Sequence, residues 1–175
     1  KTVKMLMSNP LSRKITYKVV SNFAKTELLS GVTTIRTVGG ISHFDSKLRD
    51  EILSGKVVGP RIVASNEGIS VPHGHMAGSV AIAASTIDEA LALVDKAKNE
   101  KVDLIKLMIT GGVLDAKEKG VPGELKMAPE MVKAVCDKAH SLGYKVAAHV
   151  ESPEGVKVAL ENGVEIGRAS CRERV

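Results

Sequence analysis

Short runs of β-branched and aliphatic residues alternate with longer amphipathic segments along this chain, and that alternation restricts the folds it can adopt. The runs predicted as strands are 32–38 (VTTIRTV), 61–65 (RIVAS), 103–112 (DLIKLMITGG) and 144–150 (YKVAAHV). The segments predicted as helices are 13–29, 45–53, 86–99, 128–143 and 153–162. Strands that alternate with helices of about 10 to 15 residues are typical of βαβ units, which build parallel sheets.

The order of these elements predicts a partial (β/α)8 barrel of the TIM type within the α/β class. No G-x-G-x-x-G pattern follows a strand, so the fingerprint of a dinucleotide-binding sheet is missing. A complete eight-stranded barrel takes about 250 residues, whereas four strands are predicted within residues 1–164. Chemistry in such barrels takes place at the carboxyl ends of the strands. Lys106 and His149 both lie toward those ends.

Both ends of the chain suggest that it is a piece of a longer protein. It begins at Lys1 rather than Met, and no signal-peptide pattern follows, so we expect the natural start to be missing. Residues 165–175 (EIGRASCRERV) lack periodicity and resemble the translation of a short-read sequencing adapter. We therefore expect residues 1–164 to be a barrel fragment and residues 165–175 to be non-native.

Composition and charge argue against several classes of function. The net charge is +5, but basic and acidic residues are interspersed and aromatic residues make up only 2% of the chain. Nucleic-acid binders usually concentrate basic residues and add stacking aromatics, so no nucleic-acid partner is expected. No apolar run approaches the roughly 18 residues that span a bilayer, so no membrane partner is expected. With Cys171 in the expected non-native tail, Cys136 stands alone and nothing requires an oxidising compartment, so we expect a cytoplasmic protein.

A lysine inside the apolar run 103–112 is the first functional signal. Period-2 alternation places Leu104, Lys106 and Met108 on one face of their strand, and it places Ala147 and His149 on one face of the next. If these faces line a barrel interior, the ammonium group is costly to bury unless it is deprotonated or modified. A deprotonated lysine can capture carbon dioxide to form a carbamate, and histidine is the commonest metal ligand. The alternatives are a surface lysine on an edge strand and a hydrogen-bonded core histidine.

Several motifs, in this order, resemble the amidohydrolase superfamily. They are LLSGVTTIRTVGG, GPRIVAS, GISVPHGH, VDLIKLMITGG and KVAAHVESPEGVKVALENGV. The resemblance covers nearly all of residues 20–164 and is greatest to imidazolonepropionase-like proteins and metal-dependent Xaa-Pro dipeptidases. It implies that the four predicted strands are the second to fifth of the barrel.

The resemblance also implies a site. Lys106 matches the lysine that becomes N6-carboxylysine and bridges two divalent metals, usually zinc, and His149 matches a metal ligand of the fifth strand. The family's H-x-H pair would precede Lys1, its E-H-G histidine would follow Val164, and its catalytic acid/base aspartate would lie on the eighth strand. The implied reaction is hydrolysis of an amide or other C–N bond by metal-activated water, with small molecules or dipeptides as substrates. The intact parent is expected to be a homo-oligomer, and the fragment alone to be inactive.

The remaining histidines and Cys136 lie outside the two runs that contain Lys106 and His149. His73-Gly74-His75 is not taken as the missing H-x-H pair, because it lies in a proline-containing loop after a later strand; His75 is a candidate substrate-binding residue. His140 and Cys136 are predicted on an outer helix, where the cysteine packs as a small apolar residue. His43 is expected at the surface.

Two alternative functions stay open on the sequence. The first is a mononuclear relative that opens a cyclic amide or deaminates its substrate, with Lys106 uncarboxylated. The second is a non-catalytic phosphate-binding module, which would use the glycine pairs Gly39-Gly40 and Gly111-Gly112 as backbone anion cradles after strands. The number of metals bound by the intact protein distinguishes these possibilities.

Overall fold

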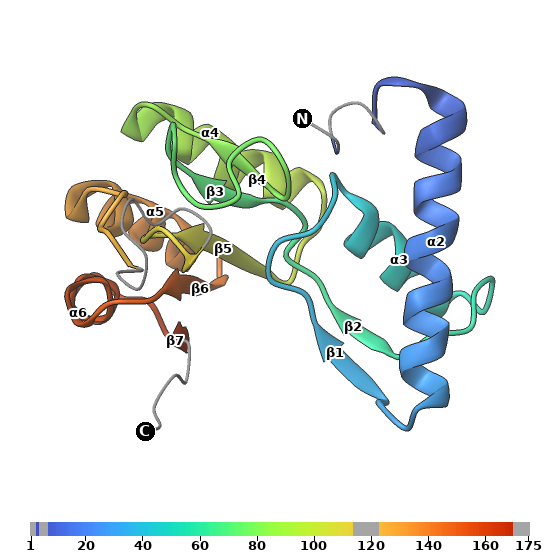
Figure 1. The fold of residues 1–175 in the computed structure, drawn as a ribbon. Helices are drawn as coiled ribbons and strands as arrows, with labels where there is room; N and C mark the ends of the chain where they lie inside the picture. Colours follow the sequence, from blue (N-terminus) through green and yellow to red (C-terminus); the bar gives the residue numbers. More distant parts are fainter. Residues whose placement is uncertain (1–2, 4–6, 114–122, 170–175) are drawn as a thin grey trace.

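The predicted helices and strands occur along the chain in the predicted order, with three further short strands among them (Figure 1). The computed structural model describes residue 3, residues 7–113 and residues 123–169. The helices are α2 (Pro10–Leu29), α3 (Phe44–Leu53), α4 (Ile87–Asn99), α5 (Pro129–Ser141) and α6 (Pro153–Glu161). The strands are β1 (Thr34–Arg36), β2 (Arg61–Val63), β3 (Gly68–Ser70), β4 (Ala81–Ala83), β5 (Leu104–Met108), β6 (Lys145–Val150) and β7 (Ile166–Ala169).

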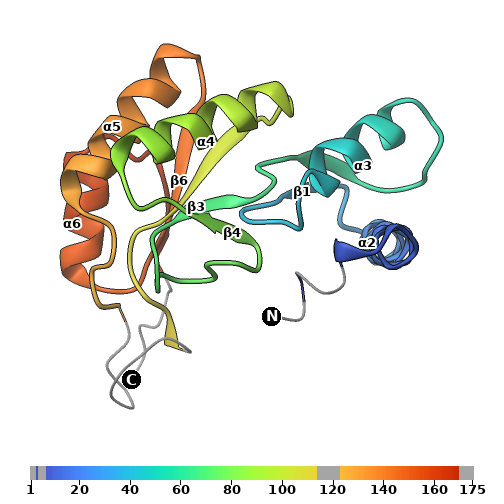
Figure 2. The same cartoon turned by 90° about the horizontal axis from the view of Figure 1, so that it is seen from above.

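The strands pair in parallel in two sheets. One sheet has five strands in the order β4-β3-β5-β6-β7, and β1 pairs with β2 in the other. Asp103, just before β5, joins the two sheets: its backbone N–H donates to the carbonyl of Ala64 (2.7 Å), and its carboxylate accepts the N–H of Ala64 (2.7 Å). These two hydrogen bonds hold the end of β2 beside the start of β5, and Figure 2 shows β1 and β2 extending to one side of the five-stranded sheet.

Helices α4, α5 and α6 cover one face of the five-stranded sheet (Figures 1 and 2). The alternation in β5 explains this arrangement, because Ile105 and Leu107 belong to the hydrophobic core under these helices whereas Lys106 does not. Parallel strands are buried on both faces, and all five residues of β5 are buried. Two helices begin as the sequence predicts: Thr86 caps α4 by accepting the N–H of Glu89 (3.2 Å), and Pro129 opens α5.

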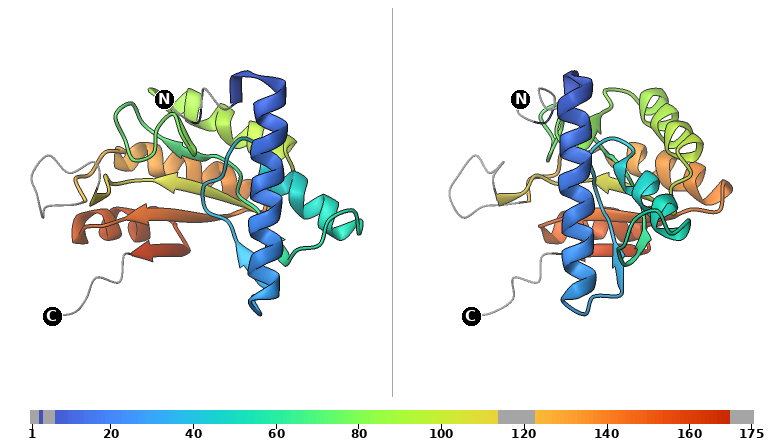
Figure 3. Two further views of the ribbon diagram at one scale, coloured as in Figure 1. Left: turned by 45° about the vertical axis from the view of Figure 1, so that its right-hand side comes forward. Right: turned by 90° about the vertical axis from the view of Figure 1, so that its right-hand side faces the viewer.

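A second, smaller core holds α2 and α3 against β1 and β2 (Figure 3). Its buried members are Ala24, Leu48, Ile62 and Ala64. Tyr17 of α2 meets Phe44 of α3 edge to face, with ring centroids 5.1 Å apart. This core fixes the helix that follows β1 and therefore the loop between them.

Asn66 ties the two parts of the molecule together through a buried polar network. Its side-chain amide accepts the N–H of Ser46 (3.0 Å) and donates to the Ser46 hydroxyl (3.0 Å) and to the carboxylate of Glu100 (2.9 Å). Asn66 has a positive φ of 55°, a conformation that asparagine tolerates better than most residues. The network positions the carboxyl end of β2 between α3 and α4.

The structure departs from the sequence predictions in three short strands. The segment 66–79, in which no strand is predicted, contains β3, and β4 follows it at Ala81–Ala83. Strand β7 lies within residues 165–175, which were predicted to be a non-native tail. A short parallel strand can form from any sequence that tolerates extended backbone, so β7 does not test the origin of these residues, and their assignment stays a prediction. Among the helices of the described ranges, none combines the length and apolarity needed to cross a bilayer.

Candidate functional site

Lys106 is an interior residue of the central strand. Its exposed fraction is 3%, and β5 lies between β3 and β6, so the interpretation as a surface lysine on an edge strand is wrong. Ala147 is its register partner on β6. On the β3 side, a Cβ added to Gly68 would lie 3.3 Å from Lys106 Cγ. Small residues on both sides therefore provide the space that the lysine side chain occupies.

Lys106 and His149 share the face of the sheet opposite the helices. Lys106 pairs with Ala147 and Met108 pairs with His149, and paired residues of parallel strands point to the same side. We call this side, with Gly68, Lys106, Met108, Ala147 and His149, the inner face. His149 is largely buried, with 14% of its side chain exposed. The predicted pair of site residues is thus brought onto adjacent strands of one face.

His75 reaches this face from the loop between β3 and β4. Its ring stacks on that of His149, with centroids 4.1 Å apart and planes 10° from parallel. The Ser70 hydroxyl donates to the His75 carbonyl (3.0 Å) and holds the loop against the end of β3. Gly74 lies so close to Ser70 and Val71 that any side chain there would displace them. The predicted substrate-binding residue therefore lies beside the predicted metal ligand.

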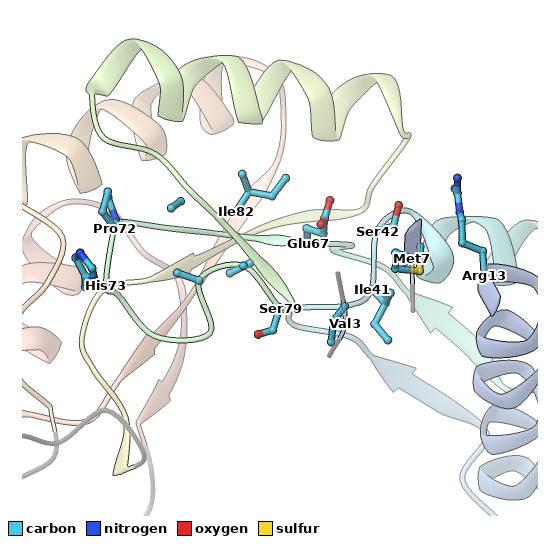
Figure 4. Close-up of a pocket in the computed structure, with 14 residues that line it drawn as sticks. Val3, Met7, Arg13, Ile41, Ser42, Glu67, Pro72, His73, Ser79 and Ile82 are labelled. Atoms are coloured by element: carbon cyan, nitrogen blue, oxygen red, sulfur yellow. The ribbon is translucent and has the colours of Figure 1, made fainter. Parts of the chain in front are cut away.

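His73 lies elsewhere. It is exposed, has a positive φ of 60° and lines a cavity of about 610 Å³ (Figure 4). Figure 4 shows His73 and Pro72 at one end of this cavity and Arg13 of α2 at the other, with Glu67 between them. Neither Lys106 nor His149 lines it. His73 and His75 thus point to different places and do not act as a ligand pair.

Glu151 was missed by the sequence analysis. It follows β6 and continues the alternation of Ala147 and His149. Because Glu151 lies two residues after His149, the sequence alone indicates that both side chains point to the same side. Its Oε1 lies 3.8 Å from His149 Nε2. Its backbone N–H donates to the Thr110 hydroxyl just after β5 (3.0 Å). A carboxylate therefore stands at the carboxyl end of the strand, next to the histidine.

The remaining candidates lie away from the inner face. His140 is exposed on α5, where its Nε2 lies 3.2 Å from the Glu165 carboxylate. Cys136 is fully buried on the same helix, and burial raises the pKa of its thiol to about 12. His43 precedes α3, is partly buried and lies with its Nδ1 3.2 Å from the Ser42 hydroxyl.

Asp45 is the second acidic group near the ends of the strands. Burial raises the pKa of its carboxyl, although hydrogen bonds with the Thr37 side chain and the Asn66 backbone act in the opposite direction. Its Oδ2 packs against Gly40, where a Cβ would clash with the carboxyl group. Asp45, in the first turn of α3, therefore packs against the loop that follows β1 and is not part of the row of Lys106 and His149.

The glycine pairs do not form anion cradles. The N–H of Gly39 donates to the Ser65 hydroxyl (3.0 Å), and that of Gly40 donates to the Asn66 carbonyl (2.8 Å). The N–H of Gly111 donates to the Glu124 carbonyl (2.8 Å). A phosphate would need these donors to be available, so the structure disfavours the alternative of a phosphate-binding module.

The donor set on the inner face fits part of a divalent-metal centre. An imidazole and a lysine amine that carboxylation would convert into an oxygen ligand lie on adjacent strands. Within residues 3, 7–113 and 123–169, no group of three or more His, Cys, Asp or Glu side chains is placed to hold a metal ion. Lys106 and His149 therefore fit two positions of such a centre rather than a complete one.

The sequence model of the amidohydrolase family matches residues 3–170. This chain belongs to the amidohydrolase family. Members of this family generally use divalent metals, which fits the partial donor set on the inner face. No curated protein matches the chain.

Solved amidohydrolase structures resemble the chain over most of its length. A putative prolidase from Bifidobacterium longum is 41% identical, with a TM-score of 0.75, over 86% of this chain and 36% of that one. A Xaa-Pro dipeptidase with methionine bound in its active site is 32% identical, with a TM-score of 0.79, over 89% of this chain and 41% of that one. Ochratoxinase from A. niger, 21% identical with a TM-score of 0.78 over 93% of this chain and 41% of that one, shows the shared fold alone.

The chain thus spans 36% and 41% of the length of the two prolidase-type structures. Its parallel strands, with helices on one face and Lys106 and His149 on the other, form part of an amidohydrolase (β/α)8 barrel. The predicted fold class is confirmed.

Proposed function

We propose that this chain is part of a metal-dependent hydrolase that cleaves an amide or other C–N bond, with dipeptides as the substrate class. The observation that supports it most is the buried Lys106 on the inner face beside His149. The similarity to a putative prolidase and to a Xaa-Pro dipeptidase supports the choice of substrate class. The aspartate expected as acid/base would lie on the eighth strand, beyond the strands described here, so no residue of this chain is proposed for that role.

Lys106 is proposed to act as N6-carboxylysine. The neutral amine adds to carbon dioxide with loss of one proton, and the new N–C bond turns a cationic side chain into an anionic one. On this buried face the carbamate anion would be balanced by the divalent cations beside it. His149 supplies a nitrogen ligand from the next strand. Two metals, proposed to be zinc, would lower the pKa of a bound water toward about 7 and polarise the scissile carbonyl.

His75 is proposed to contact the substrate. Its ring lies flat against His149, so it lines the proposed site and is not a solvent-exposed loop residue. The mononuclear relative with an uncarboxylated lysine is the second candidate, and a metal content of one rather than two per subunit would favour it. A homo-oligomeric parent, a cytoplasmic location and the absence of nucleic-acid and membrane partners stay predictions.

Lys106→Ala in the longer protein is expected to lose most of the bound metal and most of the hydrolytic activity, because the bridging ligand is removed. Added bicarbonate should raise the metal content of the wild type. Metal analysis and a dipeptide-hydrolysis assay measure both effects. Lys145→Ala, an exposed lysine at the start of β6, is the matched control and should change neither. Full metal content and normal turnover in Lys106→Ala would refute the proposed role.

His149→Asn in the longer protein should weaken metal binding tenfold or more, at least about 1.4 kcal/mol, because a ligand at a strand end is lost. His140→Asn should leave metal affinity unchanged, because that ring is exposed on α5. Competition with a chelator measures both affinities. Equal losses in the two variants would contradict the placement of His149 at the metal centre.

Residues 1–175 expressed alone are proposed to be inactive and prone to associate. Within the described residues, β1 pairs only with β2 and β7 pairs only with β6, and such open strand edges template further pairing. Two ligands are also too few for the three that a catalytic zinc usually takes from protein. Light scattering, metal analysis and a dipeptide assay test this. A monodisperse monomer with stoichiometric metal and turnover would overturn it.

A further inference from the structure

Glu151 holds a buried carboxylate oxygen with no hydrogen-bond partner. Its side chain is 13% exposed, and Oε2 is buried without a donor among the residues that the structure describes. The other oxygen, Oε1, lies 3.8 Å from His149 Nε2, too far for a hydrogen bond. Burying an ionised carboxylate without donors is costly. The position is therefore suited to a cationic partner that arrives with a ligand.

The backbone around Glu151 is fixed, so the carboxylate is held in place. Its N–H is bonded to the Thr110 hydroxyl, and the methyl group of Thr110 lies where a side chain at Gly155 would be. A Cβ at Gly123 would collide with the Glu151 carbonyl, and Gly123 has a positive φ of 94°. Ser152 then caps α6 by accepting the N–H of Gly155 (3.1 Å). Two glycines thus permit the close packing that anchors this residue.

Asp45 also has a buried carboxylate oxygen, but it lies in a different part of the molecule from Glu151. Its Oδ2 is also buried and without a hydrogen-bond partner among the described residues. That oxygen, however, packs against the backbone of Gly40 in the loop after β1. Glu151 instead continues the row of Ala147 and His149 on the inner face, so it is the buried carboxylate that stands beside the proposed metal ligand.

We propose that Glu151 binds the cationic amino group of the substrate and so selects dipeptides with a free N-terminus. This inference rests on the proposed function. In an unblocked dipeptide the ammonium group is one carbon away from the scissile carbonyl. A carbonyl bound at the metal that His149 would hold therefore brings the ammonium group near Glu151, whose Oε1 lies 3.8 Å from His149 Nε2. An ammonium group supplies the charge-assisted hydrogen bonds that Oε2 lacks. An N-acyl dipeptide has no such charge and leaves the carboxylate unpaired.

The test measures binding without hydrolysis, in the full-length metal-loaded protein. The probes are a phosphinic pseudodipeptide, whose P–CH2 linkage replaces the peptide bond, and its N-acetyl derivative. Calorimetry should show that the wild type binds the free amine at least tenfold more tightly. Glu151→Gln, which keeps the shape of the side chain, should lose this preference by weakening only the free-amine probe. Glu154→Gln, an exposed glutamate three residues along, should behave as the wild type.

Each other result overturns the inference. A preference that persists in Glu151→Gln, equal weakening of both probes, or no binding of either probe would exclude amine recognition by this residue. Loss of metal from Glu151→Gln would make it a metal ligand instead. A separate dipeptide-hydrolysis assay distinguishes the two proposals: a wild type that binds with the amine preference but cleaves no C–N bond would refute the proposed function alone.

Discussion

The burial of Lys106 in the middle of a parallel sheet is the constraint on which the rest of the site depends. A long lysine side chain fits there because Gly68 and Ala147 flank it on the neighbouring strands. Ile105 and Leu107 point to the other face, where α4, α5 and α6 cover them. One strand thus serves a hydrophobic core on one side and a polar site on the other, and this division explains why a lysine interrupts an apolar run.

The groups around Lys106 are positioned by contacts that lie outside the site. The Ser70 hydroxyl holds the His75 loop, and Thr110 holds the backbone of Glu151. The Asn66 network fixes the ends of β2 and α3. Rigid support of this kind keeps a site in a productive geometry. The stacked rings of His75 and His149 and the nearby carboxylate are therefore parts of one arrangement, built from the loop after β3 and the carboxyl end of β6.

Much of this arrangement follows from the sequence, and the exceptions have physical reasons. Period-2 alternation and parallel pairing place Lys106 and His149 on one face, because both rules act locally. Strands β3 and β4 have three residues each and contain little more than Gly, Ala, Ile and Ser, so they carry no usable periodicity. The stacking of His75 depends on a loop with left-handed residues, including Met76 with a φ of 56°, which no local pattern encodes. Glu151 follows the same alternation as His149 and could have been predicted.

The proposed carbamate on Lys106 is tested most directly by carbon-13 NMR of the full-length protein. The metal-loaded protein is exchanged into carbon-13-labelled bicarbonate and then freed of excess label. A single protein-bound carbamate resonance is expected in the wild type and in Lys145→Ala, and it should be absent from Lys106→Ala. A fully metal-loaded, active wild type without any carbamate resonance would contradict the account.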